Sequence, residues 1–363
     1  NIQRFTQDFM GTQTVRLEQN YRSTKTILDA ANGVISHNAG RLGKDLWTDG
    51  EDGDPIKLYA GFNEQDEARF IVEQIQSWTD EGNPRKSSAI LYRSNAQSRV
   101  IEEALIRVGL PYRIYGGQRF YERLEIRNAL AYMRLIIGRG DDPALERIIN
   151  TPTRGIGSKT VDDLRAIARE NNVSMWQAIG LAQQNGLLGS RARSSLAGFA
   201  ALINELDSET VELPLEEMVE HVIHRTGLIE FHKAEKGERG QARVENLEEL
   251  VSAAKTFRAE DDSLSPLQQF LDSAALDAGD SQADPYEDSV QMMTLHSAKG
   301  LEFPLVILAG LEENLFPHRM SVEEPGRLEE ERRLAYVCIT RAQHRLLITY
   351  AESRRLHGSE TYN

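Results

Sequence analysis

The chain has 363 residues, a formal net charge of −14 and a single cysteine. Its length allows two or three hydrophobic cores, and its 40% apolar and 27% charged residues argue against general disorder. No run approaches the ~18 apolar residues that a membrane-spanning helix needs, so we expect no membrane partner and a cytoplasmic location.

The negative charge also excludes one way of binding DNA. A protein that coats nucleic acid through a broad basic face needs many Lys and Arg side chains to neutralise phosphates, so any DNA site here should be a local groove. The lone Cys338 cannot form an intramolecular disulfide, and no Cys/His cluster has the spacing of a zinc site. We therefore predict no metal ion bound by residues of this chain.

Short apolar runs alternate with amphipathic runs from residue 14 to residue 115, a pattern typical of a parallel α/β layer. Helices are expected near residues 70–78 and 100–108, where apolar residues recur at helical spacing. Strands are expected at residues 15–17, 56–60, 89–92 and 112–115.

The strand pattern disappears between residues 122 and 284, where long helical periodicity replaces it. It returns at residues 290–295, 305–309 and 346–350, with a charged helix at 329–340. The simplest interpretation is an α/β domain interrupted by an inserted all-helical domain. The joins are expected at Gly116-Gly117 and within the polar stretch 278–288, where turn-forming and acidic residues cluster.

The sequence contains no G-x-x-x-x-G-K-[ST] loop, the motif that cradles the phosphates of ATP. The tetrapeptide at 66–69, Asp-Glu-Ala-Arg, looks like a helicase Asp-Glu box, but it follows polar residues and begins a predicted helix. The chain also opens on Asn1 without a methionine. We expect an excised fragment that does not hydrolyse ATP by itself.

Three segments carry unusual groups of polar residues: LEQNYRST at 17–24, MTLHSAKGLEFP at 293–304 and EEERRLAYVCITRA at 329–342. In the first, Tyr21 and Arg22 should lie at the carboxyl end of a strand, where α/β proteins gather ligands; alternatively, Ser23 simply caps a helix beside a surface arginine. In the second, the alternative to a ligand site is that the histidine is structural and the lysine is merely solvated. In the third, the Glu/Arg run can be a paired, solvated helix face, and Arg341 can be a phosphate contact or a surface charge.

Taken together, these segments resemble motifs of the UvrD/Rep/PcrA family of superfamily 1 DNA helicases, in the right order and over essentially the whole chain. The resemblance implies a discontinuous second RecA-like domain at 1–116 and 287–363, without its own phosphate loop, and a helical insertion at 117–286. It also implies ATP with Mg²⁺ as the cofactor, with the metal ligands outside this fragment. The implied partners are an upstream RecA-like domain of the same protein, single-stranded DNA with its junction to duplex, and repair proteins.

The same resemblance implies a role for each matching residue. Tyr21 would stack on adenine, Glu302 would bind the ribose, and Arg22 and Arg341 would reach the γ-phosphate as catalytic fingers. Eight residues would contact DNA: Arg93, Asn95, His296 and Lys299 on the single strand, and Thr153, Gly155, Gly157 and Lys159 in a helix-hairpin-helix turn on the duplex.

Two other functions remain open from the sequence. The chain could be a docking module derived from a helicase, although such a module would have no use for Tyr21, Arg22, Glu302 and Arg341 together. It could also be the helicase half of a helicase-nuclease, although no cluster of nuclease carboxylates is visible in the sequence.

Overall fold

The computed structural model describes residues 5, 8–13, 15–39, 45–279, 283–284, 286–324, 326–356 and 359–362. The chain divides into two compact units, which we describe separately. The first unit comprises Asn1–Gly61, Glu73–Arg93 and Val290–Tyr350, and the second comprises Phe62–Val72, Ser94–Ser289 and Ala351–Asn363.

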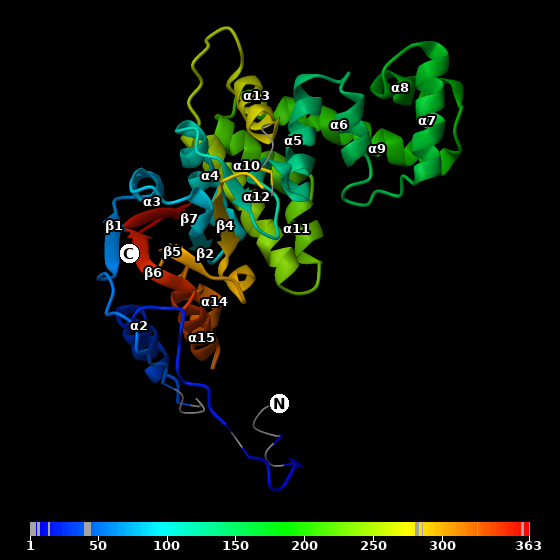
Figure 1. Ribbon diagram of the computed structural model, residues 1–363. Helices are drawn as coiled ribbons and strands as arrows, with labels where there is room; N and C mark the ends of the chain where they lie inside the picture. Colours follow the sequence, from blue (N-terminus) through cyan, green and yellow to red (C-terminus); the bar gives the residue numbers. More distant parts are fainter. Residues whose placement is uncertain are drawn as a thin grey trace. The chain divides into compact units, whose positions relative to one another are not determined.

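A six-stranded sheet has the strand order β1-β6-β5-β2-β4-β3 (Figure 1). The pairs β2–β4, β2–β5 and β5–β6 are parallel, as the alternating pattern predicted. The strands are β1 (Lys57–Gly61), β2 (Ser88–Tyr92), β3 (Tyr112–Ile114), β4 (Val290–Thr294), β5 (Phe303–Ala309) and β6 (Ala342–Ala351). A separate antiparallel hairpin joins β7 (Ser353–Leu356) to β8 (Ser359–Tyr362).

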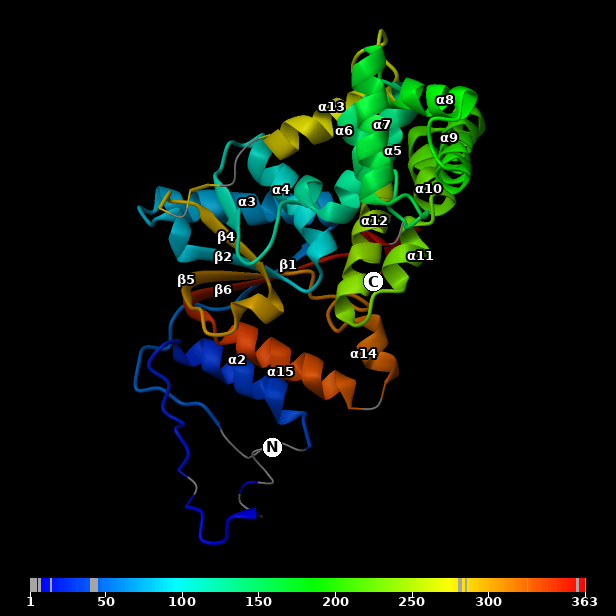
Figure 2. The same ribbon diagram turned by 90° about the vertical axis from the view of Figure 1, so that its right-hand side faces the viewer.

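Two helices of the first unit, α2 (Lys25–Ser36) and α15 (Arg327–Ile339), lie side by side along one face of this sheet (Figure 2). Ile27 and Cys338 from these helices share a buried cluster with Leu91 and Val306 of the central strands. Because β2 is buried along its whole length, its sequence is a continuous apolar run. Burial raises the pKa of the Cys338 thiol to about 12, so this cysteine is an inert core residue.

The first unit also contains short elements that connect the strands. The helix α3 (Glu64–Asp80) begins in the second unit and ends in the first. The remaining elements are η1 (Arg85–Ser87), η4 (Leu295–Ala298) and α14 (Arg319–Glu323).

The second unit is mainly helical, and no strand occurs among its described residues between 122 and 284, as predicted. Its helices bury one apolar core, to which Leu130, Phe199 and Leu247 belong. The helices are α4 (Ser98–Arg107), α5 (Leu124–Ile137), α6 (Asp142–Ile148), α7 (Ser158–Asn171), α8 (Met175–Asn185), α9 (Ser190–Thr210), α10 (Leu215–Arg225), α11 (Leu228–Lys233), α12 (Glu238–Thr256) and α13 (Pro266–Gly279), with short turns η2 (Asn95–Gln97) and η3 (Phe120–Glu122). The boundaries between these units differ from the predicted joins, and part of the stretch 278–288 lies outside the described residues.

The predicted strand at residues 15–17 is wrong. This segment has no regular structure, and only an isolated bridge joins Gln19 to Trp47. Val15 and Leu17 are 75% and 79% exposed, so their apolar side chains gain nothing from a sheet position. The hairpin β7–β8 was not predicted because its sequence is largely polar.

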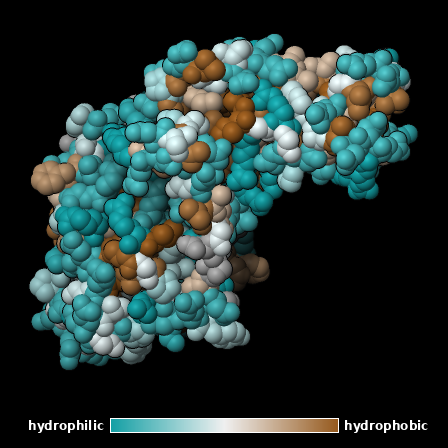
Figure 3. Space-filling view, turned by 90° about the horizontal axis from the view of Figure 1, so that it is seen from above, coloured by the Kyte–Doolittle hydropathy of each residue, from teal (hydrophilic) through white to brown (hydrophobic). Residues whose placement is uncertain are grey.

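The prediction that the Asp-Glu-Ala-Arg tetrapeptide at 66–69 begins a helix is confirmed. Asp66 lies in the first turn of α3, where its carboxylate accepts a hydrogen bond from the Phe62 N–H at 3.1 Å. No group of three potential metal ligands occurs among the described residues. No helix in the described part of the chain is long and apolar enough to cross a membrane, and the face drawn in Figure 3 is mostly hydrophilic, with separate apolar patches.

Candidate nucleotide and nucleic-acid sites

Two arginines meet at the start of two neighbouring strands in the first unit. Glu302 immediately precedes β5 and Arg341 immediately precedes β6, and these parallel strands pair with Phe303 opposite Ala342. Arg22 joins them: its Nε donates to Glu302 Oε2 at 2.6 Å. The site therefore lies at the amino ends of β5 and β6, which corrects the expectation that Arg22 sits at the carboxyl end of a strand.

Arg341 is held in place by three hydrogen bonds to backbone and side chain. Its Nε donates to Val337 O at 2.8 Å, one terminal nitrogen donates to Leu301 O at 3.1 Å, and the other donates to Thr340 Oγ1 at 3.2 Å. Burial and the nearby charge of Arg22 lower the pKa of Arg341. Glu302 forms its ion pair with Arg22, and its charge also acts on nearby Arg341. One carboxylate thus stands against two guanidinium groups, and the surplus positive charge favours an anionic ligand.

The turn that carries Arg22 is fixed by its neighbours. Asn20 Oδ1 accepts hydrogen bonds from the N–H groups of Arg22 at 2.8 Å and Ser23 at 2.9 Å, which is an Asx turn. Ser23 Oγ donates to Ala342 O at 2.6 Å and forms no cap on α2. The alternative in which Ser23 only caps a helix is therefore wrong, because its hydroxyl ties this turn to β6.

Tyr21 projects from the same turn and is 86% exposed. Its hydroxyl donates to Gln19 Oε1 at 2.7 Å, so the ring has a local anchor while both faces remain open to solvent. In the same site, Gln343 Nε2 donates to Glu302 Oε1 at 3.2 Å. The arrangement combines an exposed aromatic ring, an anchored carboxylate and two cations.

Arg93, a predicted DNA contact, forms a paired ion bridge with Glu331 of α15. Its Nε and terminal nitrogen lie 3.1 and 2.9 Å from the two carboxylate oxygens. Glu331 also accepts from His318 N at 3.1 Å and Ser321 Oγ at 3.2 Å. Burial acts to raise the pKa of Glu331, but Arg93 and these hydrogen bonds outweigh it and hold the pKa below its ordinary value. Arg93 thus ties the end of β2 to α15, and its contact with DNA stays a prediction.

His296 and Lys299 lie in the turn that follows β4, and both are exposed. Thr294 fixes this turn, because its hydroxyl accepts from Ser297 N at 3.4 Å. Asn95 is half-buried in η2 of the second unit. The structure leaves His296 and Lys299 accessible to a ligand, whereas the shared track with Asn95 stays a prediction.

The predicted hairpin turn lies in the second unit, before α7. Asn150 Oδ1 accepts from the N–H groups of Arg154 at 2.8 Å and Ile156 at 3.2 Å, and the Ile156 side chain is buried. Gly155 has a φ of +75°, a conformation that glycine adopts without strain. Gly157 precedes α7 without any side-chain cap, so backbone N–H groups at the start of this helix remain available.

The remaining two residues of this turn are Thr153 and Lys159, and both are exposed. A phosphate placed before α7 would meet N–H groups, the helix dipole and the Lys159 charge together. The local geometry therefore fits the predicted phosphate contact.

Comparison with known protein families adds the decisive observation. Residues 15–353 match the UvrD-like helicase C-terminal domain. The chain belongs to this family. The match includes all three segments that carried the predicted resemblance, and it confirms that resemblance.

The chain is also similar in sequence, over essentially its whole length, to individual helicases. It is 58% identical to DNA helicase II of Escherichia coli (strain K12), over 100% of this chain and 51% of that protein. It is 57% identical to DNA helicase II of Haemophilus influenzae, over 99% of this chain and 50% of that protein. It is 42% identical to the ATP-dependent DNA helicase PcrA of Staphylococcus aureus (strain MRSA252), over 100% of this chain and 50% of that protein. The chain spans about half the length of these relatives.

Sequence reasoning missed three supporting residues of the sites. Asn20 orders the turn of Arg22, Gln343 holds Glu302, and Glu331 engages Arg93. An Asn just before a turn is a recognisable signal, so Asn20 could have been found. Gln343 and Glu331 act through contacts that only the folded chain brings together.

Proposed function

We propose that this chain is the carboxyl-terminal half of an ATP-dependent 3′–5′ DNA helicase and translocase that unwinds duplex DNA in repair and replication. The observation that carries the proposal is the pair of arginines, Arg22 and Arg341, anchored beside Glu302 and the exposed Tyr21. The family membership supports it. We retain the cytoplasm as the expected location.

In this proposal, ATP and Mg²⁺ are bound mainly by an upstream RecA-like domain that carries the phosphate loop. Tyr21 stacks on the adenine and Glu302 accepts a hydrogen bond from the ribose. Arg22 and Arg341 approach the γ-phosphate from across a cleft and stabilise the charge that develops during phosphoryl transfer. Backbone acceptors hold Arg341 in advance, which reduces the cost of ordering it in the transition state.

The DNA would lie along the residues that are predicted to contact it. His296 and Lys299 contact the single strand, with Arg93 and Asn95 on the same path, while the turn from Thr153 to Lys159 contacts duplex phosphates. Residues 1–116 and 287–363 would form the second RecA-like domain, and residues 117–286 its helical insertion. Closure on ATP and reopening after hydrolysis would change the grip on the single strand and produce directional steps.

A docking module without enzymatic work is the competing function. Such a module needs neither a pair of adjacent guanidinium groups nor an exposed tyrosine next to them. Three hydrogen bonds fix Arg341 to neighbouring groups. They favour a nucleotide site over a docking module, because they hold in one orientation a charged group that would otherwise move freely in water.

The test is DNA-stimulated ATP hydrolysis by the chain alone and in a mixture with an upstream RecA-like half that carries a phosphate loop. We expect no hydrolysis by the chain alone and DNA-dependent hydrolysis by the mixture. Sedimentation establishes whether the two halves have assembled. Hydrolysis by the chain alone would overturn the proposal, as would silence in a mixture that has assembled.

A further inference from the structure

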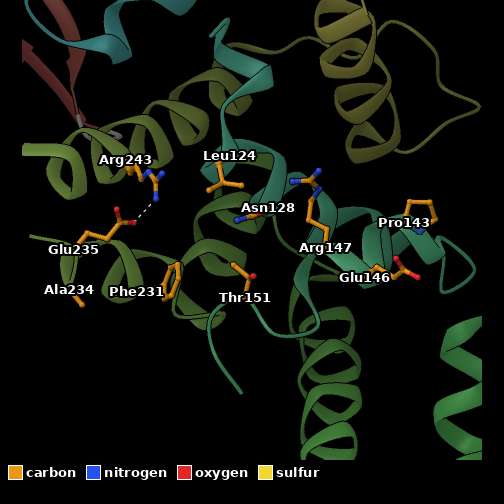
Figure 4. Close-up of a pocket in the computed structure, with 10 residues that line it drawn as sticks. All are labelled: Leu124, Asn128, Pro143, Glu146, Arg147, Thr151, Phe231, Ala234, Glu235 and Arg243. Atoms are coloured by element: carbon orange, nitrogen blue, oxygen red, sulfur yellow. Dashed lines mark hydrogen bonds and ion pairs between the residues drawn. The ribbon is translucent and has the colours of Figure 1, made fainter. Parts of the chain in front are cut away.

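A pocket of about 800 Å³ opens among α5, α6, α11 and α12 in the second unit (Figure 4). Its lining carries two carboxylates, Glu146 and Glu235, and two guanidinium groups, Arg147 and Arg243. The dashed line in Figure 4 marks the ion pair between Arg243 and Glu235, which measures 2.6 Å. These charges balance, so the pocket offers no net charge to a ligand.

A chain of hydrogen bonds in the first unit, by contrast, ends on a residue of the proposed nucleotide site. The Tyr21 hydroxyl donates to Gln19 Oε1 at 2.7 Å, and Gln19 Nε2 donates to Asp49 Oδ2 at 2.9 Å. Asp49 lies 30 residues from Gln19 in the sequence, outside the three segments that carry the family resemblance. The ring of Tyr21 is therefore connected to a second segment of the chain.

The chemistry of these three groups fixes the direction of both hydrogen bonds. The Asp49 carboxylate can only accept, so it holds the Nε2 end of the Gln19 amide. The Oε1 end of the amide then faces Tyr21, where it accepts the phenol hydrogen. Without Asp49 the amide could turn over and present its NH₂ group instead, and the Tyr21 hydroxyl would lose its fixed acceptor.

The segment that carries Asp49 is held on both sides of that residue. On the amino-terminal side, Trp47 N donates to Glu18 O at 3.1 Å, and Trp47 O accepts from Asn20 N at 2.7 Å. On the carboxyl-terminal side, the carbonyl groups of residues 51–52 accept from the first two N–H groups of α2, at 3.1 and 3.0 Å. Asp49 is therefore a fixed point, and the chain of hydrogen bonds transmits its position to the aromatic ring.

The position of the ring matters because Tyr21 is 86% exposed. An exposed aromatic side chain would otherwise sample several rotamers, and binding would have to order it. The hydrogen bond holds the ring by its hydroxyl and leaves the faces open for a planar base. A ring that is fixed in advance binds a nucleotide base at a lower entropic cost.

We propose that Gln19 and Asp49 are positioning residues that hold Tyr21 ready to stack on the base of the bound nucleotide. The inference rests on the proposed function, in which Tyr21 contacts adenine. Neither positioning residue touches the nucleotide. Their loss therefore weakens the binding of ligands that carry a base and leaves the rate of phosphoryl transfer unchanged.

The test is titration calorimetry of ADP and of pyrophosphate, each with Mg²⁺, into the assembled mixture of this chain and the upstream half. ADP carries a base and pyrophosphate does not. In Asp49→Ala, the dissociation constant for ADP should rise about fivefold, the effect of one modest hydrogen bond, whereas that for pyrophosphate should stay within a factor of about two. The kcat of DNA-stimulated ATP hydrolysis should not change.

Tyr21→Phe keeps the ring but lacks the hydroxyl, so it should reproduce the loss seen in Asp49→Ala. Combining the two substitutions should weaken ADP binding no further than either one alone, because both break the same chain of hydrogen bonds. Asp52→Ala is the matched control, since it makes the same charge change in the same segment. Its carboxylate is 85% exposed and lies 3.8 Å from Lys25, so this variant should bind ADP as the unsubstituted chain does.

Losses that add in the double variant would overturn the positioning role, as would an equal weakening of ADP and pyrophosphate binding in Asp49→Ala. Tyr21→Ala separates this role from the proposed function. If Tyr21→Ala weakens ADP binding while Asp49→Ala does not, the positioning role is wrong and the adenine contact stands. If neither variant weakens ADP binding, the adenine contact itself is wrong.

Discussion

Replacing Arg341 with alanine should lower the kcat of DNA-stimulated ATP hydrolysis by about 10³-fold or more in a mixture with the upstream half, because arginine fingers contribute at this level. The side chain is pre-positioned by Val337 O and Leu301 O, and alanine removes the charge without removing a core group. Steady-state hydrolysis at saturating ATP and single-stranded DNA measures the loss. Nucleotide affinity should change much less than kcat, since the charge acts mainly in the transition state.

Arg327→Ala is the matched control for this variant. Arg327 begins α15, the helix that ends two residues before Arg341. It is about half exposed and pairs only with Glu324 in the described structure, so its loss should leave kcat within a factor of about two. An Arg341→Ala mixture that retains nearly full kcat would show that this arginine is a surface charge.

Replacing Arg99 with alanine should reduce the free energy of unfolding by about 3 kcal/mol or more. Arg99 is 2% exposed and bridges Glu249 at 2.6 Å and Glu103 at 2.7 Å. Its loss leaves Glu249, whose side chain is only 12% exposed, without its partner, and desolvation already raises the pKa of that carboxyl. When the pKa of a carboxyl is raised in the folded state, the free energy of unfolding falls as the pH rises through that pKa. The difference in this free energy between the variant and the original chain should therefore grow from mildly acid to mildly alkaline pH.

Urea unfolding of the chain at two pH values measures this effect. Arg107→Ala, an exposed arginine on the same helix, should cost less than about 0.5 kcal/mol. The double variant Arg99→Ala with Glu249→Gln should recover part of the loss, because the second change removes the stranded charge. A single variant as stable as the original chain at both pH values would contradict this interpretation of the buried pair.

The central strands β2 and β5 could be predicted because they are buried on both faces, so that Ala89–Tyr92 and Leu305–Ala309 stand out as apolar runs between amphipathic helices. The segment 15–17 misled the prediction because its apolar residues look like a strand but find no partner. Apolar periodicity reports burial only when another element covers the residues. The second unit's helices were predictable for the same reason, whereas the limits of its compact body were not, because they depend on contacts between distant segments.

The candidate nucleotide site was only partly predictable. Tyr21, Arg22, Glu302 and Arg341 stood out through the resemblance of long motifs, and the structure brings the two arginines and the carboxylate together. Their position at the amino ends of β5 and β6 was not predictable, since it depends on which strands pair. The engagement of Arg93 by Glu331, 238 residues away in sequence, was likewise invisible in a linear motif.

The central claim is that Arg22 and Arg341 act across a cleft on a nucleotide held by an upstream domain. Its most direct test is the affinity between the chain and that upstream half, measured by calorimetry with ADP alone and with ADP plus fluoroaluminate, which mimics the phosphoryl group in transit. Our account predicts that the mimic tightens association at least about tenfold and that Arg22→Ala combined with Arg341→Ala abolishes this gain. An affinity that is the same with ADP and with the mimic, or a gain that survives loss of both arginines, would contradict it.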